Sequence, residues 1–163
     1  MQEELDETDC RILALLQADA SLTAADVAKQ VGLSQSPCWR RIARLEHAGF
    51  IRQRVALLNR KKLGLGVVVF AQVKVVRGSR DALAEFEAAV RSFPEVQECY
   101  MLMGDTDFLL KVITSDVDAY EEFLRLKLVR LPAVGGVRSN MALTPVKEST
   151  ALPLERLLQR AAG

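Results

Sequence analysis

The chain has 163 residues, of which 50% are hydrophobic and 26% are charged. This is enough for one or two small domains with buried cores, and the composition argues against intrinsic disorder. No run of about 18 apolar residues occurs, so a membrane-spanning helix is excluded. The acidic N-terminal stretch also lacks the basic and apolar regions of a signal peptide. We therefore predict a cytoplasmic protein with no membrane partner.

The cysteines do not form a metal or disulfide pattern. There are three, Cys10, Cys38 and Cys99, at wide spacings, and His47 is the only histidine. An odd number of cysteines and a lone histidine argue against a zinc site or a disulfide framework. We expect no metal and no cofactor.

The formal net charge is only +1, but the charge is unevenly distributed. Between Lys29 and Lys62 the chain carries nine basic residues and a single acid, Glu46. Such a run is often a solvated surface. Because these charges lie on and just after one helical pattern, a phosphate-binding surface is the alternative that we favour.

The first part of the chain predicts three helices. Apolar residues at helical spacing follow Asp6, whose acidic turn suits a helix start, and this helix should end near Asp19. Thr23 can cap a second, short helix, and Gly32 can end it in a left-handed conformation. A third helix follows at once and should end at Gly49. Two short helices joined by a tight glycine turn after a supporting helix predict a helix-turn-helix.

A wing and a hinge are expected after the third helix. Apolar and basic residues alternate over residues 50–58, which predicts the strands of a small wing. Residues 59–66 then resemble a hinge. We therefore assign residues 1–58 to a winged helix-turn-helix domain.

The remainder, residues 67–163, predicts a ferredoxin-like domain, which makes the protein α+β overall. Its β-branched and apolar patterns alternate between strand and helix in the order βαββαβ. The expected elements are a strand at 67–76, a helix at 79–92, strands at 96–103 and 108–113, a helix at 116–130 and a strand at 137–146. Residues 154–161 could add a terminal helix.

The third helix is expected to have two different faces. On a helical wheel Cys38 shares an apolar stripe with Ile42 and Leu45, while Arg40 and Arg44 share the opposite face. A thiol on the core side is more often a small buried hydrophobe than a nucleophile. The helix is therefore predicted to expose its arginines to a negatively charged partner.

The start of this helix is where a recognition helix presents side chains to the major groove of DNA. Either Ser34 or Ser36 can cap it, and Pro37 is tolerated in the first turn. Trp39 lies on the flank, where packing between helix and wing is favoured over base contact. His47 is either a plain surface residue or a phosphate contact. The candidate DNA-binding residues are Ser34, Gln35, Ser36, Trp39, Arg40, Arg41 and Arg44.

Many of these residues together resemble the Lrp/AsnC family of bacterial and archaeal transcription regulators, over nearly the whole chain. The matching residues are Leu5, Asp6, Asp9, Ile12, Leu13, Leu16, Gln17, Val31, Gly32, Leu33, Ser34, Pro37, Cys38, Arg41, Arg44, Leu45, Glu46, Gly49, Phe50, Ile51, Leu57, Leu58, Asn59, Gln97, Glu98, Cys99, Gly104, Asp105, Asp107, Leu109, Leu110, Leu131 and Pro132. The resemblance implies a RAM-type second domain that pairs two chains, with dimers assembling into octamers. It also implies that a small amino acid binds between dimers, near the turn at residues 104–107.

The chemistry of that turn is compatible with an amino-acid effector. Glycine permits close backbone approach, free N–H groups can receive a carboxylate, and a nearby acid can meet an ammonium group. Large apolar side chains precede it, which favours a small or sulfur-containing amino acid. The candidate effector-binding residues are Tyr100, Met101, Leu102, Met103, Gly104, Asp105 and Asp107. The alternative is a plain hairpin turn with a satisfied aspartate.

Two details bear on which effector is expected. Thr106 stands where the family often has an aromatic residue. The segments 37–41, 55–58 and 64–66 are similar to those of a subgroup that responds to cysteine.

An enzyme would need a nucleophile, a base and an orienting group that converge in one pocket, and we predict no catalytic residues. Glu98, Asp105 and Asp107 are more simply interpreted as turn-forming acids. The resemblance to the Lrp/AsnC family implies a sequence-specific regulator of amino-acid metabolism or transport genes that binds double-stranded DNA, and this is our prediction. A global, nucleoid-like architectural protein is the alternative. A metabolite sensor that binds protein would not need an exposed arginine face.

Overall fold

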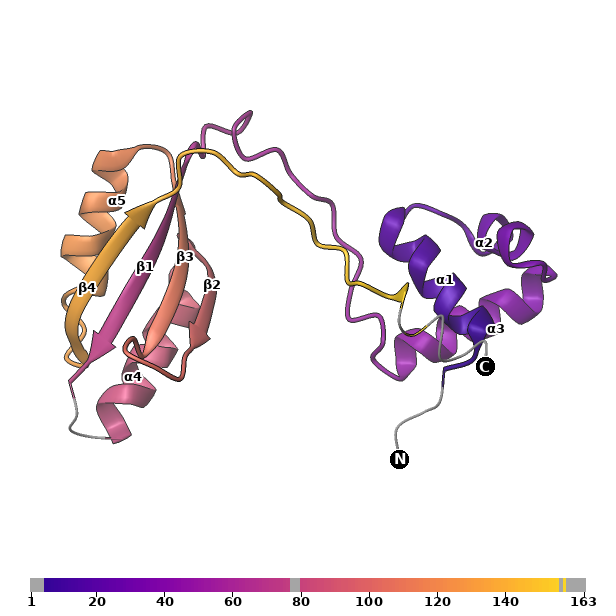
Figure 1. Ribbon diagram of the computed structural model, residues 1–163, viewed down its shortest axis with the longest axis horizontal. Helices are drawn as coiled ribbons and strands as arrows, with labels where there is room; N and C mark the ends of the chain where they lie inside the picture. The colour runs from indigo at the N-terminus through magenta and orange to yellow at the C-terminus, as the bar shows by residue number, and fades with distance from the viewer. Residues whose placement is uncertain (1–4, 77–79, 156, 158–163) are drawn as a thin grey trace. The chain divides into compact units, whose positions relative to one another are not determined.

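The computed structural model describes residues 5–76, 80–155 and 157 (Figure 1). The chain divides into two units: Met1–Leu57 with Glu148–Gly163, and Leu58–Lys147. By this division the described residues 148–155, which we expected in the second domain, group with the first unit. Gln17 makes two hydrogen bonds to the backbone of Leu152, of 2.9 and 2.8 Å. The terminal helix expected at 154–161 falls mostly outside the described residues.

The first unit contains three helices: α1 (Glu7–Ala18), α2 (Ala24–Val31) and α3 (Gln35–His47). Asp6 and Thr23 cap the first two through reciprocal hydrogen bonds with the third residue of each helix. These bonds satisfy N–H groups that have no partner inside the helix. Gly32 ends α2 at φ 73°, a left-handed conformation that favours glycine. The predicted helix-turn-helix is thus present.

One apolar cluster holds these helices together. It contains Ile12 and Leu16 from α1, Val27 from α2, and Ile42 and Leu45 from α3, all buried. Each helix contributes one face at helical spacing, so the cluster fixes the rotation of α3 about its own axis. The other face of α3 is left toward solvent.

The predicted wing is wrong. Residues 52–59 form neither helix nor strand. Their alternating pattern exposes large apolar side chains, with Leu57 and Leu58 more than 70% accessible. A strand needs a hydrogen-bonded partner, and none of the described residues pairs with this segment in a sheet. Arg54 instead forms an ion pair with Glu46 at the end of α3.

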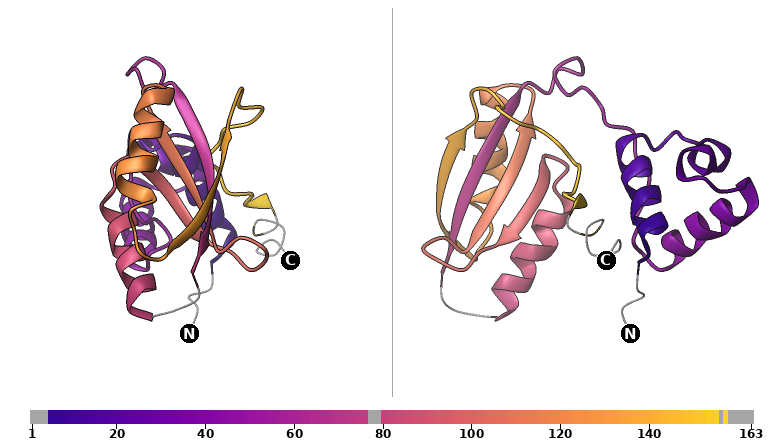
Figure 2. Two further views of the ribbon diagram at one scale, coloured as in Figure 1. Left: turned by 90° about the vertical axis from the view of Figure 1, so that its left-hand side faces the viewer. Right: turned by 45° about the vertical axis from the view of Figure 1, so that its right-hand side comes forward.

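The second unit has the predicted βαββαβ order. Its sheet is antiparallel in the order β2-β3-β1-β4. The elements are β1 (Val67–Val75), α4 (Arg80–Ser92), β2 (Val96–Met101), β3 (Phe108–Thr114), α5 (Val117–Phe123), a π-helical turn η1 (Leu124–Leu128) and β4 (Val134–Met141). Both helices cover the same face of the sheet, as the two views of Figure 2 show.

The bounds of the last strand differ from expectation and follow its ladder to β1. The last strand starts at Val134 rather than 137 and ends at Met141 rather than 146. Its ladder to β1 begins opposite Val75, beside a bulge, and ends opposite Val69. The sequence pattern alone does not contain this register.

The core of the second unit lies between the sheet and the helices. Val69, Ala71 and Val73 alternate inward from β1 and pack with Phe86 of α4 and Phe123 of α5, all buried. Neither of the described helices of the second unit lies over the opposite face of the sheet. Among the residues that the structure describes, no helix has the length and apolar character needed to cross a bilayer.

Candidate DNA-binding surface and effector turn

The start of α3 is open to solvent. Ser34, Gln35, Ser36, Trp39 and Arg40 are all exposed. Ser34 occupies the N-cap position, but its side chain makes no capping hydrogen bond to the described chain. We expected a serine side chain to cap the first N–H groups of α3, and this expectation is wrong for Ser34. We call these five residues the reading surface.

The buried side of α3 explains why these residues point outward. Cys38 is fully buried, as predicted, and burial raises the pKa of its thiol. A buried thiol of raised pKa is a poor nucleophile. Trp39, one residue on, is 61% exposed. The expectation that it packs between helix and wing is wrong, because residues 50–58 form no wing against which it could pack.

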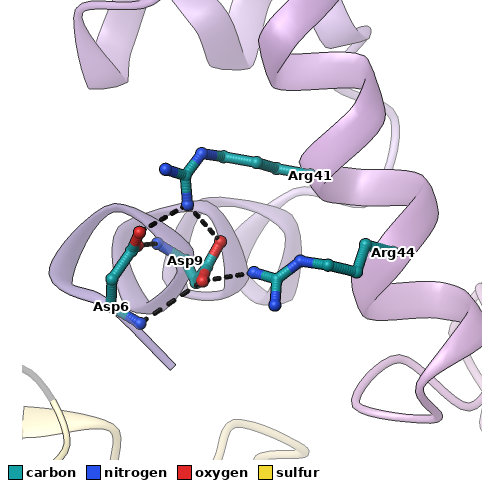
Figure 3. Close-up of polar contacts among 4 residues, drawn as sticks. All are labelled: Asp6, Asp9, Arg41 and Arg44. Atoms are coloured by element: carbon teal, nitrogen blue, oxygen red, sulfur yellow. Dashed lines mark hydrogen bonds and ion pairs between the residues drawn. The ribbon is translucent and has the colours of Figure 1, made fainter. Parts of the chain in front are cut away.

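Two other arginines of α3 lie in an ion-pair cluster with α1 (Figure 3). Nη1 of Arg41 lies 2.6 Å from Oδ2 of Asp6 and 2.8 Å from Oδ1 of Asp9. Nη2 of Arg44 lies 2.5 Å from Oδ2 of Asp9. We call Asp6, Asp9, Arg41 and Arg44 the Asp–Arg cluster. Asp9 is its centre, with only 1% of its side chain exposed.

The local chain positions both carboxylates. Asp6 and Asp9 form the capping box of α1: the Asp9 N–H donates to Asp6 at 2.7 Å and the Asp6 N–H to Asp9 at 3.3 Å. Negative charge at a helix N-terminus is favourable. The same two carboxylates reach across to α3, so one pair of acids both starts α1 and ties it to α3.

Electrostatics within the cluster favour the charged forms of Asp6 and Arg41. Burial pushes the pKa of Asp6 upward, but hydrogen bonds from the Asp9 backbone and from Arg41 outweigh it and leave this pKa below its usual value. Hydrogen bonds to Asp6 and Asp9 raise the pKa of Arg41. Asp6 and Arg41 are thus held in their charged forms on the helix side that faces α1.

This changes the prediction for Arg44. We expected it on the free face of α3 together with Arg40, but its side chain is 37% exposed and contacts Asp9. A helical wheel of α3 contains no information on the acids that α1 brings to it. The signal in the sequence is the matched spacing: Asp6 and Asp9 are three residues apart on α1, as Arg41 and Arg44 are on α3, so the two pairs can meet.

The predicted effector turn lies between β2 and β3. Tyr100, Met101, Leu102, Met103 and Asp105 are all exposed. The Met103 side chain extends fully into solvent. In the described single chain these side chains therefore line an open surface.

Two residues of the turn are held by backbone geometry. Gly104 adopts φ 148°, a value that side-chain-bearing residues rarely reach. Asp107 is half-buried: its Oδ2 accepts from the N–H of Val75 at 2.8 Å, and its own N–H donates to the carbonyl of Val73 at 3.2 Å. Its carbonyl accepts from the N–H of Leu102. Asp107 thus joins the turn to the neighbouring strand β1.

A polar chain flanks the turn on β2. The Tyr100 hydroxyl donates to Glu98 at 2.7 Å, which lowers the pKa of Glu98 and raises that of Tyr100. Lys111 on β3 is also 3.2 Å from Glu98. Within the described residues, no group of three or more potential ligand side chains is placed to hold a metal ion.

The fold and these two regions define a class of protein. A helix-turn-helix unit with an exposed recognition helix, followed by a separate ferredoxin-like unit, is the organisation of a two-domain DNA-binding regulator. The sequence profile of the AsnC-type helix-turn-helix domain matches residues 5–46, and that of the Lrp/AsnC ligand binding domain matches residues 68–152. The chain belongs to the Lrp/AsnC family.

Individual relatives support this over 94% of the chain. The leucine-responsive regulatory proteins of Escherichia coli K12 and Salmonella typhimurium are each 39% identical over 153 residues, covering 94% of this chain and 93% of theirs. A transcriptional regulator from Neisseria meningitidis, solved with L-methionine, has a TM-score of 0.91 at 39% identity, covering 94% of this chain and 99% of that one. An AsnC-family regulator from Agrobacterium tumefaciens has a TM-score of 0.89 at 41% identity, with the same coverage of each chain.

The protein is therefore a DNA-binding transcription regulator and not an enzyme. This confirms the predicted family, the α+β fold class with a helix-turn-helix and a ferredoxin-like domain, and the general function.

Proposed function

We propose that this regulator reads double-stranded DNA with the reading surface of α3 and that a small amino acid changes its DNA affinity by binding beside the 100–107 turn. The observation that carries the proposal is the division of α3. Five polar or aromatic residues are exposed at its start, while Cys38, Ile42 and Leu45 are buried and Arg41 and Arg44 are ion-paired behind them.

The division suggests a role for each part. Ser34, Gln35 and Ser36 reach base edges in the major groove, as residues at the start of a recognition helix do. Trp39 and Arg40 lie on the exposed side and contact the sugar-phosphate backbone. The Asp–Arg cluster sets the angle of α3 on α1. Arg41 and Arg44 thus act on DNA mainly by positioning the helix.

The effector assignment rests on the turn and on relatives. The relatives named above include leucine-responsive proteins and a regulator solved with L-methionine. Asp105 is exposed and available to an ammonium group, and Gly104 leaves room for a carboxylate near the backbone. Tyr100, Met101, Leu102 and Met103 provide apolar contacts. Asp107 completes the site by holding the turn, and methionine, leucine and cysteine are the first effectors to test.

We also propose that the chain forms a homodimer through the uncovered face of the sheet, and that dimers assemble into an octamer. Phe70 on β1 lies on this face and is 39% exposed, and Leu109 on β3 is partly exposed. A second copy would bury them, as paired sheets do. An effector site between dimers would then couple amino-acid binding to assembly. A protein that acts on chromosomal DNA in this way works in the cytoplasm.

A selection from random duplex DNA tests the proposal. The protein is expected to enrich one motif, and fluorescence anisotropy should then give at least tenfold tighter binding to that motif than to scrambled duplex. Adding methionine, leucine or cysteine should change this affinity by a coupling of about 1–3 kcal/mol. Equal affinity for motif and scramble would point instead to the architectural alternative. If none of the common amino acids shifts the affinity, the effector assignment fails.

A further inference from the structure

The basic run of the sequence continues beyond α3 into the second unit. Between Glu46 and Asp81 the chain carries eight basic residues and no acid, so nothing within this stretch neutralises its charge. Its densest part is Arg60, Lys61 and Lys62, which are consecutive and lie a few residues before β1. The reading surface of α3 does not include them.

These three residues lie in a compact turn and not in an extended hinge. Oδ1 of Asn59 accepts from the N–H of Lys62 at 3.1 Å, and the N–H of Leu65 donates to the carbonyl of Arg60 at 2.8 Å. Gly64 adopts φ 77°, a left-handed conformation that favours glycine. We call residues 59–64 the basic turn, which forms the small loop before β1 in Figure 1.

The three cations of the basic turn have different surroundings. Nη1 of Arg60 donates to the carbonyl of Gly66 at 3.0 Å and thereby closes the turn. Lys61 and Lys62 are exposed, and neither forms an ion pair with an acid in the part of the chain that the structure describes. The basic turn therefore presents two ammonium groups, while the arginine is used to hold its shape.

Acids near the base of the turn do not offset these charges. Asp116 caps α5 through its carboxylate. Leu65 borders a surface cleft with Glu95, which pairs with Lys127. Glu122 borders the same cleft and forms no ion pair with either lysine of the turn. Both ammonium groups are thus available to a partner outside the chain.

Two adjacent ammonium groups on an ordered turn favour a polyanion. Like charges repel, and this repulsion is relieved where several negative charges are closely spaced. Duplex DNA carries one negative charge per about 1.7 Å of its axis, and each lysine that meets a phosphate releases condensed counterions. Because this protein is a DNA-binding regulator, duplex phosphates are the polyanion that it meets.

The length of the connecting chain keeps the basic turn near any DNA that α3 holds. Lys61 is 14 residues after His47, the last residue of α3, so the chain between them can span at most about 50 Å. Tethering of this kind gives the second contact a high effective concentration of phosphates. A contact that is weak by itself can therefore add to the affinity.

We propose that Lys61 and Lys62 form a second DNA contact, to duplex phosphates outside the bases that α3 reads. Asn59 and Arg60 position the turn and leave the two ammonium groups free. Contacts to phosphates carry no sequence information, so this contact adds affinity without changing which motif is preferred.

The double variant Lys61→Gln/Lys62→Gln tests the proposal by fluorescence anisotropy at several salt concentrations. Binding should weaken about tenfold, and the slope of log K against log salt should become shallower by about two for each turn in contact. Both effects should be equal on the selected motif and on scrambled duplex of the same length. Since the slope is also measured on scrambled duplex, the test does not depend on the residues assigned to the reading surface.

Two further variants make the result specific to the turn. Arg125→Gln/Arg130→Gln removes the same charge from exposed positions elsewhere in the second unit and should leave the salt slope unchanged. Lys61→Arg/Lys62→Arg keeps both charges and should bind as wild type does. Circular dichroism and light scattering should show the native fold and an unchanged assembly for all three variants.

Four outcomes would overturn the proposal. The first is an unchanged salt slope in the folded glutamine variant. The second is an equal loss in the Arg125/Arg130 variant, which would make the effect one of overall charge. The third is weakening on the motif alone, which would make the lysines base-reading residues. The fourth is a changed assembly mass, which would place their role in oligomerisation.

Discussion

The helix-turn-helix and the 100–107 turn are built alike in one respect. In each, the residues that mark the family motif divide into an exposed group and a group whose polar atoms are used within the protein. In the first region Asp9 and Arg44 hold helices together while Ser34 remains exposed. In the second, Asp107 ties the turn to β1 while Asp105 remains exposed. A residue of a functional motif is thus not necessarily a contact residue.

The two regions differ in the hydrogen-bond partners of their structural aspartates, Asp9 and Asp107. Asp9 is held by two guanidinium groups, whereas Asp107 accepts from a backbone N–H that carries no charge. A charged network is expected to depend more strongly on its central residue than a neutral hydrogen bond does. Substitutions can test both the division and this difference.

The largest effect is expected from Asp9→Ala. Removing the central carboxylate leaves Arg41 and Arg44 without their shared partner and removes part of the α1 cap. Breaking a buried ion pair costs about 3–5 kcal/mol. Both arginines are about one-third exposed and can rehydrate, so we expect about 3 kcal/mol, at the lower end. Urea denaturation of the full chain measures it, with Asp9→Asn, which keeps the shape, as the control. A loss as small as that of an ordinary surface substitution would contradict the structural role of the cluster.

Asp107→Ala comes next, with an expected loss of about 2 kcal/mol, because the N–H of Val75 loses its acceptor in a half-buried position. Denaturation in urea again provides the measurement. The matched control is Asp105→Ala, which should leave stability unchanged and alter only effector binding. Equal effects of Asp107→Ala and Asp105→Ala on both stability and effector binding would contradict the distinction between a structural Asp107 and an exposed, effector-binding Asp105.

Arg40→Ala should have a smaller effect and should act on DNA only. Loss of one phosphate contact is expected to weaken binding about fivefold to tenfold and to lower the salt dependence by about one counterion. The unfolding midpoint should not change, since Arg40 is exposed. Arg44→Ala makes the informative comparison, because it should lower stability as well as binding. An unchanged DNA affinity for Arg40→Ala would remove Arg40 from the reading surface.

The smallest expected effect is on the stability of the protein at low pH, and it comes from Asp6. The pKa of Asp6 is lower in the folded protein than its ordinary value of 3.8, so its ionised form stabilises the fold above that pH, and this contribution is lost as the pH falls through the lower, folded value. Asp6→Asn should therefore reduce the loss of stability between about pH 5 and pH 3. The effect is modest because half of the side chain is exposed. Parallel pH profiles for variant and wild type would contradict the assignment.

Much of the fold could be predicted from the sequence because its signals are local. Asp6, Thr23 and Gly32 determine where helices begin and end through bonds within a few residues, and the period of apolar residues determines which face of α3 is buried. The order βαββαβ and the exposure of the residues at the start of α3 follow from the same rules.

Other features depend on contacts between residues far apart in the sequence, and only the tertiary structure shows them. Residues 50–58 have the alternation of a wing, but a strand forms only where another strand supplies its hydrogen bonds, and none of the described segments does so. Arg44 has the wheel position of a free cation, but Asp9 lies within reach only once α1 packs on α3. Lys127 likewise meets Glu95, 32 residues away in the chain, only in the folded second unit. Each depends on contacts between residues distant in sequence, which folding alone brings together.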